Sequence, residues 1–115
     1  MQITERTTQG VIVLELHGRL TTEHGAELLR DKVSSALSKG QSRMLLNLAG
    51  VPYIDSGGLG ELVRCLLTTR KTRGSVKLVG LTGRVVDVLT VTKLITVFET
   101  YETETEALAS FLTTA

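Results

Sequence analysis

Residues 51–60 carry the residue types in this chain that are best suited to chemistry. They read VPYIDSGGLG, so an aspartate and a serine, Asp55 and Ser56, stand beside a pair of glycines. An apolar run at 44–48 precedes them and a helical pattern follows, which places the Asp-Ser pair on a turn between a strand and a helix. The first N–H groups of a helix lack intrahelical partners and favour an anion. Ser56 is therefore a candidate for phosphorylation, phosphate contact or nucleophilic attack.

Two enzymatic interpretations of this turn fit poorly. A hydrolase nucleophile elbow reads Gly-x-Ser-x-Gly, but Ile54 stands two residues before Ser56 where the first glycine should be. The catalytic histidine of such a hydrolase follows the serine in the chain, whereas both histidines here precede Ser56. Gly58 begins a Gly-x-Gly-x-x-Gly dinucleotide pattern whose third position is Val63, and no Gly-Lys-Ser/Thr phosphate loop is present. The glycines equally well allow a tight bend and a close approach of the helix to the sheet. We therefore expect no enzyme, no catalytic residues and no cofactor.

Composition and spacing alone leave two interpretations of Asp55 and Ser56 open. In the first, Ser56 is a regulatory phosphosite on a short polar loop. Phosphorylation would add about −1.5 to −2 charges, which is large for a chain with a net charge of +1. In the second, the two residues cap the helix, because both types accept hydrogen bonds from the first backbone N–H groups.

Composition narrows the function classes further. The chain has 115 residues, enough for one domain at 1–115 with a single core. A net charge of +1 and 3% aromatic residues argue against nucleic acid as a partner. Cys65 is the one cysteine, so the chain has neither an internal disulfide nor a cysteine metal cluster. The two histidines cannot form a zinc site unless carboxylates supply the other ligands. With no signal sequence and no apolar run of about 20 residues to span a membrane, we expect a cytoplasmic protein.

The first half of the chain predicts two strands followed by a helix. Residues 3–8 predict an edge strand, which turns back through 9–10 into a β-branched central strand at 11–16. Thr21 or Thr22 is placed to cap the helix that follows. The apolar residues spaced by three and four, which define its expected buried face, are Ala26, Leu29, Val33 and Leu37.

The helix after the Asp-Ser turn has the strongest pattern and is predicted over about 57–73. Its apolar stripe repeats at i, i+3, i+4, i+7 and i+8, through Leu59, Leu62, Val63, Leu66 and Leu67. We expect Leu62, Val63 and Leu66 in the core. The cations Arg70, Lys71 and Arg73 suit the negative end of the helix better than a nucleic-acid patch, and Gly74 is expected to close it.

The remaining segments complete an alternating pattern. Strands are predicted at 43–48, 76–81 and 95–98, a short helix around 85–89, and a closing helix behind a capping box at Thr103–Glu106. The order is β-β-α-β-α-β-α-β-α. Short connections between alternating elements imply a mixed, mostly parallel sheet of four to five strands with about four helices and right-handed crossovers. The sequence therefore predicts a single α/β domain.

The motif Asp55-Ser56-Gly57-Gly58-Leu59-Gly60 closely resembles the Asp-Ser-x-Gly-Leu signature of STAS domains, typified by bacterial anti-sigma factor antagonists of the sporulation and stress-response type. Gly18-Arg19-Leu20 matches the Gly-x-Leu of the same family, and the resemblance covers essentially the whole chain. It implies transcription regulation by partner switching. In that family, an anti-sigma factor that is also a serine kinase binds the unphosphorylated antagonist. The kinase then phosphorylates the serine that matches Ser56, and the phosphorylated antagonist is released. A serine phosphatase reverses the modification.

The resemblance also implies which residues bind the partner: Arg19, Thr21, Asp55, Ser56, Gly57 and Gly58. Two positions depart from the family pattern. Gly57 stands where a second serine is common, and Thr21 stands where Asp or Asn is common. A second phosphosite at Thr21 or Thr22, as in a stressosome-like arrangement, stays open. The alternative function is a STAS module that binds a small ligand or docks on a transporter or a stressosome-like assembly.

Overall fold

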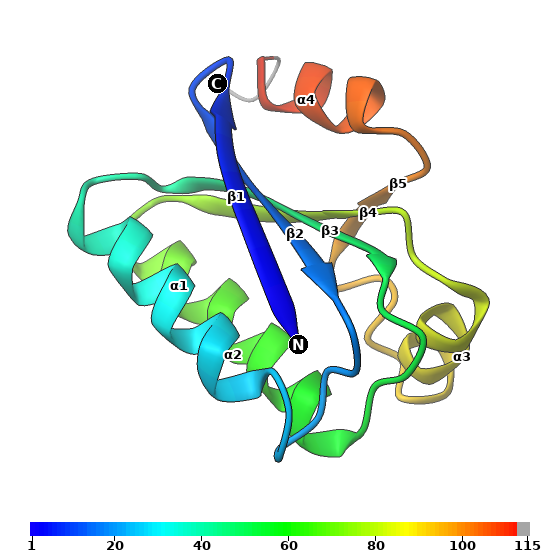
Figure 1. Cartoon of the computed structure of the whole chain (residues 1–115). Coiled ribbons are helices and arrows are strands. Elements are labelled where there is room, and N and C mark those ends of the chain that lie inside the picture. Colours follow the sequence, from blue (N-terminus) through cyan, green and yellow to red (C-terminus); the bar gives the residue numbers. More distant parts are fainter. Residues whose placement is uncertain (113–115) are drawn as a thin grey trace.

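A computed structural model describes residues 1–112, which form a five-stranded sheet with helices on both faces (Figure 1). The strands are β1 (Gln2–Thr8), β2 (Val11–His17), β3 (Arg43–Gly50), β4 (Ser75–Val79) and β5 (Glu99–Tyr101). The helices are α1 (Ala26–Ser38), α2 (Ser56–Lys71), α3 (Gly83–Val91) and α4 (Glu104–Leu112). The predicted fold class and element order are confirmed.

The strands lie in the sheet in the same order as in the chain. β1 pairs antiparallel with β2, and β2 to β5 are parallel to their neighbours. Gln9 and Gly10 connect the two strands and have φ angles of 53° and 78°; a two-residue hairpin turn of type I′ requires positive φ at both positions. Because three right-handed crossovers advance in one direction, α1, α2 and α3 must share one face of the sheet. Helix α4 follows the last strand and covers the other face (Figure 1).

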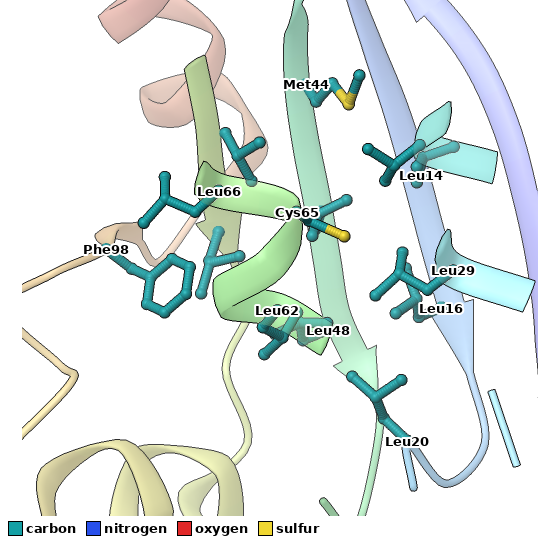
Figure 2. Close-up of a cluster of buried hydrophobic side chains, with 14 of the residues drawn as sticks. Leu14, Leu16, Leu20, Leu29, Met44, Leu48, Leu62, Cys65, Leu66 and Phe98 are labelled. Carbon is teal, nitrogen blue, oxygen red and sulfur yellow. The ribbon is translucent and has the colours of Figure 1, made fainter. Parts of the chain in front are cut away.

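Alternate residues of the central strands supply two apolar cores. The larger core lies between the sheet and the three crossover helices, where side chains of β2, β3, α1 and α2 point toward one another (Figure 2). The smaller core lies under α4 and takes the opposite faces of the same strands; it contains Val11, Val13, Leu45, Val79, Ala107, Leu108 and Phe111. Burial on both faces explains why the central strands read as continuous apolar runs.

Helix α2 buries a face that is shifted from the predicted one. Leu62 and Leu66 are buried as expected, and Val63 is partly buried against the core. Leu67, the last residue of the apolar stripe and not among those expected in the core, is 52% exposed. Helix α1 lies alongside α2 and covers Glu61 and Cys65 instead. A neighbouring helix has therefore moved the buried face around the axis.

Two predicted boundaries are wrong. Helix α1 begins at Ala26 and has no threonine cap, because Gly25 before it adopts a φ of 94°, which interrupts a helical path. The predicted strand at 95–98 is a turn that follows α3, with the N–H of Val97 donating to the carbonyl of Leu94; the last strand begins at Glu99. Phe98 is buried in the larger core from this irregular segment, which is why the apolar run resembles a strand.

Two helix ends test the sequence signals further. The predicted pairing of Thr103 with Glu106 before α4 is present in part: the Glu106 N–H donates to Thr103 Oγ1 at 3.2 Å, as in a capping box, but the Glu106 carboxylate accepts the Thr103 hydroxyl at 2.9 Å. At the end of α2 the positive φ, 62°, falls on Arg73 and not on Gly74. The Gly74 N–H still donates to the carbonyl of Thr69 at 3.0 Å, so Gly74 takes part in closing the helix as expected. A Cβ atom at Gly74 would overlap the carbonyl oxygen of Ser42, so this glycine also allows close packing.

Candidate functional site

Asp55, and not Ser56, caps helix α2. Asp55 has extended backbone angles, and its Oδ1 accepts the N–H of Gly58 at 2.8 Å. Its carbonyl oxygen accepts the N–H of Leu59 at 2.9 Å, which starts the helical hydrogen bonds. The capping interpretation is thus resolved in favour of Asp55, and the phosphosite interpretation of Ser56 stays a prediction. Asp55 satisfies the helix end, and Ser56, the first residue of α2, is exposed with no side-chain hydrogen bond within residues 1–112.

The segment at 18–22 runs beside the loop that leads into α2. The Leu20 N–H donates to the carbonyl of Tyr53 at 3.0 Å, and the Asp55 N–H donates back to the carbonyl of Leu20 at 3.3 Å. Leu20 and Ile54 form a parallel bridge, and both are buried. These contacts extend the β2–β3 pairing beyond the strands, so that two loops at the carboxyl edge of the sheet hold each other in place.

The glycines at the start of α2 allow the helix to dock on that segment. A Cβ atom at Gly58 would overlap the carbonyl oxygen of Leu20, which is rigid backbone. A Cβ at Gly57 would overlap the hydroxyl of Thr22, so the absence of a side chain at 57 and the threonine at 22 fit as a pair. The close-approach interpretation of these glycines is confirmed.

Thr21 and Thr22 have different surroundings although they are adjacent. Thr21 is only 8% exposed, and its Oγ1 accepts the N–H of His24 at 3.0 Å. It therefore stabilises a local turn before α1. Thr22 is exposed, and its N–H lies 3.4 Å from Asp55 Oδ2. The partner-binding role of Thr21 and a phosphosite at either threonine stay predictions.

Three residues that the sequence analysis did not group lie together near this turn. The guanidinium carbon of Arg19 is 5.8 Å from the centre of the Tyr53 ring, and that of Arg84 is 5.2 Å from the same centre. All three are exposed. They follow β2, β3 and β4, and the carboxyl ends of neighbouring parallel strands meet at one edge of a sheet. That rule was the one signal that could have joined them.

A second polar cluster lies between α1 and the middle of α2. The buried carboxylate of Glu61 lies 3.0 Å from Arg30 and 3.8 Å from Arg64. The thiol of Cys65 lies 3.5 Å from Glu61 Oε2. Burial raises the pKa of the Cys65 thiol, and the neighbouring carboxylate raises it further. The thiol is thus held in its unreactive protonated form, and this cluster joins two helices.

Other features of the described residues do not coincide with the Asp-Ser turn. A hollow of about 610 Å³ is lined by Gly80, Leu81, Val86, Ile95, Thr100, Tyr101 and Glu102, none of which is a predicted site residue. Residues 1–112 bring no three His, Cys, Asp or Glu side chains together in a way that could hold a metal ion. In the same range, every helix is too short or too polar to cross a bilayer.

Comparison with known proteins matches this chain to one family. Residues 2–107 match the STAS domain family model. A Thermotoga neapolitana protein named "Putative anti-sigma factor antagonist TM1081 homolog" is 31% identical, over 90% of this chain and 91% of its own length. A Thermotoga maritima crystal structure with a similar description is 29% identical, with a TM-score of 0.87 over 94% of this chain and 92% of that one.

Unphosphorylated SpoIIAA, an anti-sigma factor antagonist, shares the fold with a TM-score of 0.75 and 21% identity, over 98% of this chain and all of that one. The expected resemblance is therefore confirmed by sequence and by fold. The Asp-Ser turn, its glycines and the 18–22 segment lie together at one edge of a sheet of this architecture. The chain belongs to the STAS domain family, and its relatives make it an anti-sigma factor antagonist-like member.

Proposed function

We propose that this chain is an anti-sigma factor antagonist that works by partner switching, with Ser56 as the phosphoacceptor. The observation that carries the proposal is the division of roles at the start of α2. Asp55 supplies the cap, so the hydroxyl of Ser56 is exposed and unengaged within the described residues. A hydroxyl on a rigid turn, with glycine at 57 and 58, leaves room for the active site of another protein to approach.

The fold itself should tolerate a phosphate on Ser56. A phosphate at a helix start meets N–H groups without intrahelical partners and a favourable helix dipole. The side chain already points to solvent, so no core contact is lost. SpoIIAA shares this fold in its unphosphorylated and its phosphorylated form, with TM-scores of 0.75 and 0.74. We therefore expect phosphorylation to change binding and not folding.

Binding of a partner should respond strongly to the same phosphate. A surface that fits a neutral hydroxyl beside the Asp55 carboxylate meets about two added negative charges and their desolvation cost after phosphorylation. In this proposal the partner is an anti-sigma factor with serine-kinase activity, which holds the unphosphorylated chain and releases the phosphorylated one. A separate serine phosphatase returns the chain to its binding form, in the bacterial cytoplasm.

The chain itself is proposed to catalyse nothing. No hydrogen bond joins the Ser56 hydroxyl to an imidazole within residues 1–112, so no activating base is in place. Purified protein should give background rates in esterase, phosphatase and nucleotide-hydrolysis assays. Turnover that disappears in Ser56→Ala would make the chain an enzyme and contradict this part of the proposal.

Phosphorylation by the partner tests the proposal. The purified chain is incubated with ATP and, one at a time, with the serine-kinase-type anti-sigma factors encoded in the same genome, and the products are analysed by mass spectrometry. We expect one of these factors to add a single phosphate to Ser56. The phosphate should be absent in Ser56→Ala and retained in Ser34→Ala, a matched control on the exposed face of α1. Phosphate on a different residue, or on none with every factor, contradicts the proposal.

A further inference from the structure

Arg19, Tyr53 and Arg84 form an exposed group, here called the guanidinium–tyrosine cluster, at the carboxyl edge of the sheet. Both guanidinium carbons lie within 6 Å of the Tyr53 ring centre, at 5.8 and 5.2 Å. Such distances allow a cation–π interaction with the ring. Tyr53 is 37% exposed, so the residue is available on the surface and is not buried.

The two positive charges of this cluster have no ion-pair partner in the described chain. Within residues 1–112, neither Arg19 nor Arg84 forms an ion pair with a carboxylate. Asp87, one turn further along α3, does not pair with Arg84. Arg6, Arg30 and Arg64 pair with carboxylates, whereas Arg43, Arg70 and Arg73 form no ion pair within the same residues. Arg19 and Arg84 differ from these other unpaired arginines because both lie against one exposed ring. Two positive charges are thus concentrated at one place on the surface, open to carboxylates of another molecule.

The cluster is continuous with the Asp-Ser turn. Tyr53 belongs to the loop that leads into α2, and its carbonyl accepts the N–H of Leu20, the residue after Arg19. The start of α3 is tied to the same loop, because Thr82 Oγ1 donates to the carbonyl of Val51 at 2.9 Å. The three residues and the capped turn are therefore parts of one surface, built from three loops that hold one another.

We propose that the guanidinium–tyrosine cluster docks an acidic segment of the partner protein that binds the unphosphorylated chain. This inference rests on the proposed function, because it assumes that a partner covers the Ser56 surface. Guanidiniums present planar sets of N–H donors that match carboxylates. Tyrosine and arginine are also the residue types that carry most binding energy in protein interfaces. The positive cluster thus attracts the partner at the same surface where a phosphate repels it.

Charge reversal at each arginine tests the inference. The variants Arg19→Glu and Arg84→Glu are measured for association and dissociation rates with the anti-sigma factor that binds the wild-type chain, at 50 mM and 500 mM NaCl. We expect each to slow association by about tenfold or more at low salt, and by less than about threefold at high salt, because salt screens exposed charges. Tyr53→Ala should accelerate dissociation at both salt concentrations, since it removes contact area.

Arg43→Glu is the matched control. Arg43 is exposed at the start of β3, at the opposite edge of the sheet, and the substitution changes net charge equally. The association rate of Arg43→Glu should stay within about twofold of the wild-type rate. Arg84→Lys should retain fast association because it keeps the positive charge. If Arg19→Glu and Arg84→Glu behave like Arg43→Glu while the wild type binds, the cluster is not a docking surface, although the proposed function stands.

Two further outcomes are distinct from that one. The same rates are also measured with the chain phosphorylated on Ser56. If the charge reversals change the binding rates of the phosphorylated chain only, the guanidiniums act on the chain's own phosphate, and the inference of an acidic partner is wrong. If the wild-type chain binds no anti-sigma factor at all, the proposed function fails, and the partner of this inference fails with it.

Discussion

The middle and the first turn of helix α2 are built in different ways. Its middle is packed from side chains: Leu62 and Leu66 are in the larger core, and Glu61 joins α1 through Arg30. Its first turn is held mainly by backbone contacts of glycines and by the Asp55 cap, and it leaves Ser56 exposed. One helix therefore separates stability from recognition, because a change at the exposed serine need not disturb the side chains that hold the fold.

Truncating the middle of α2 should have the largest effect on stability. Leu66 is 3% exposed, and Leu66→Ala should lower the free energy of unfolding by about 2–5 kcal/mol, from lost apolar contact and a residual cavity. Leu67→Ala is the matched control one position further on, at 52% exposure, and should cost less than about 0.5 kcal/mol. Urea unfolding measures both. Equal losses would show that the helix is not oriented as described.

A side chain at Gly58 should have the next largest effect. Gly58→Ala places a Cβ against the carbonyl oxygen of Leu20, so the first turn of α2 must move, at a cost of about 1–3 kcal/mol. Gly60→Ala, two residues later, meets no atom within 4 Å and should be stabilising by about 0.5–1 kcal/mol, from higher helix propensity. Thermal unfolding of the pair measures the difference. A Gly58→Ala protein as stable as Gly60→Ala would mean that backbone docking does not hold this turn.

Loss of the cap should have a smaller effect. Asp55→Ala leaves the Gly58 N–H without its side-chain acceptor and should lower the free energy of unfolding by about 0.5–2 kcal/mol. Asp55→Asn keeps an acceptor oxygen at the same position and should retain most of the stability. The two variants are compared by urea unfolding at neutral pH. If Asp55→Ala costs nothing, the serine and not the aspartate caps the helix.

The Asp-Ser turn and its glycines could be predicted from sequence because they are local signals. A polar pair followed by glycines, between an apolar run and a helical stripe, indicates a turn from a strand into a helix. The sequence could not show which of Asp55 and Ser56 caps α2. That choice depends on Leu20, whose carbonyl takes the Asp55 N–H, and this contact spans the whole of α1.

The exposed face of α2 and the guanidinium–tyrosine cluster were missed for a related reason. Apolar spacing gives the direction of a stripe to within about one residue, but the packing of α1 decides which flank is covered. Leu67 is exposed for that reason, and Glu61 is buried. Arg84 is 31 residues from Tyr53 in the sequence, and the order of the strands brings them together. The burial of a single helix position and the contacts between distant loops depend on tertiary packing, which local sequence signals do not encode.

The most direct test measures stability and binding on the same variant of Ser56. Ser56→Asp imitates part of the phosphate charge, and Ser56→Ala keeps the site neutral. Calorimetry of each against the anti-sigma factor that phosphorylates the chain should show tight binding for Ser56→Ala. If the charge costs about 3–4 kcal/mol, Ser56→Asp should bind about 150- to 1000-fold more weakly. Its melting temperature should stay within a few degrees of the wild type. Equal affinity of the two variants, or a Ser56→Asp protein that is unfolded, would contradict a switch that acts by charge in an interface.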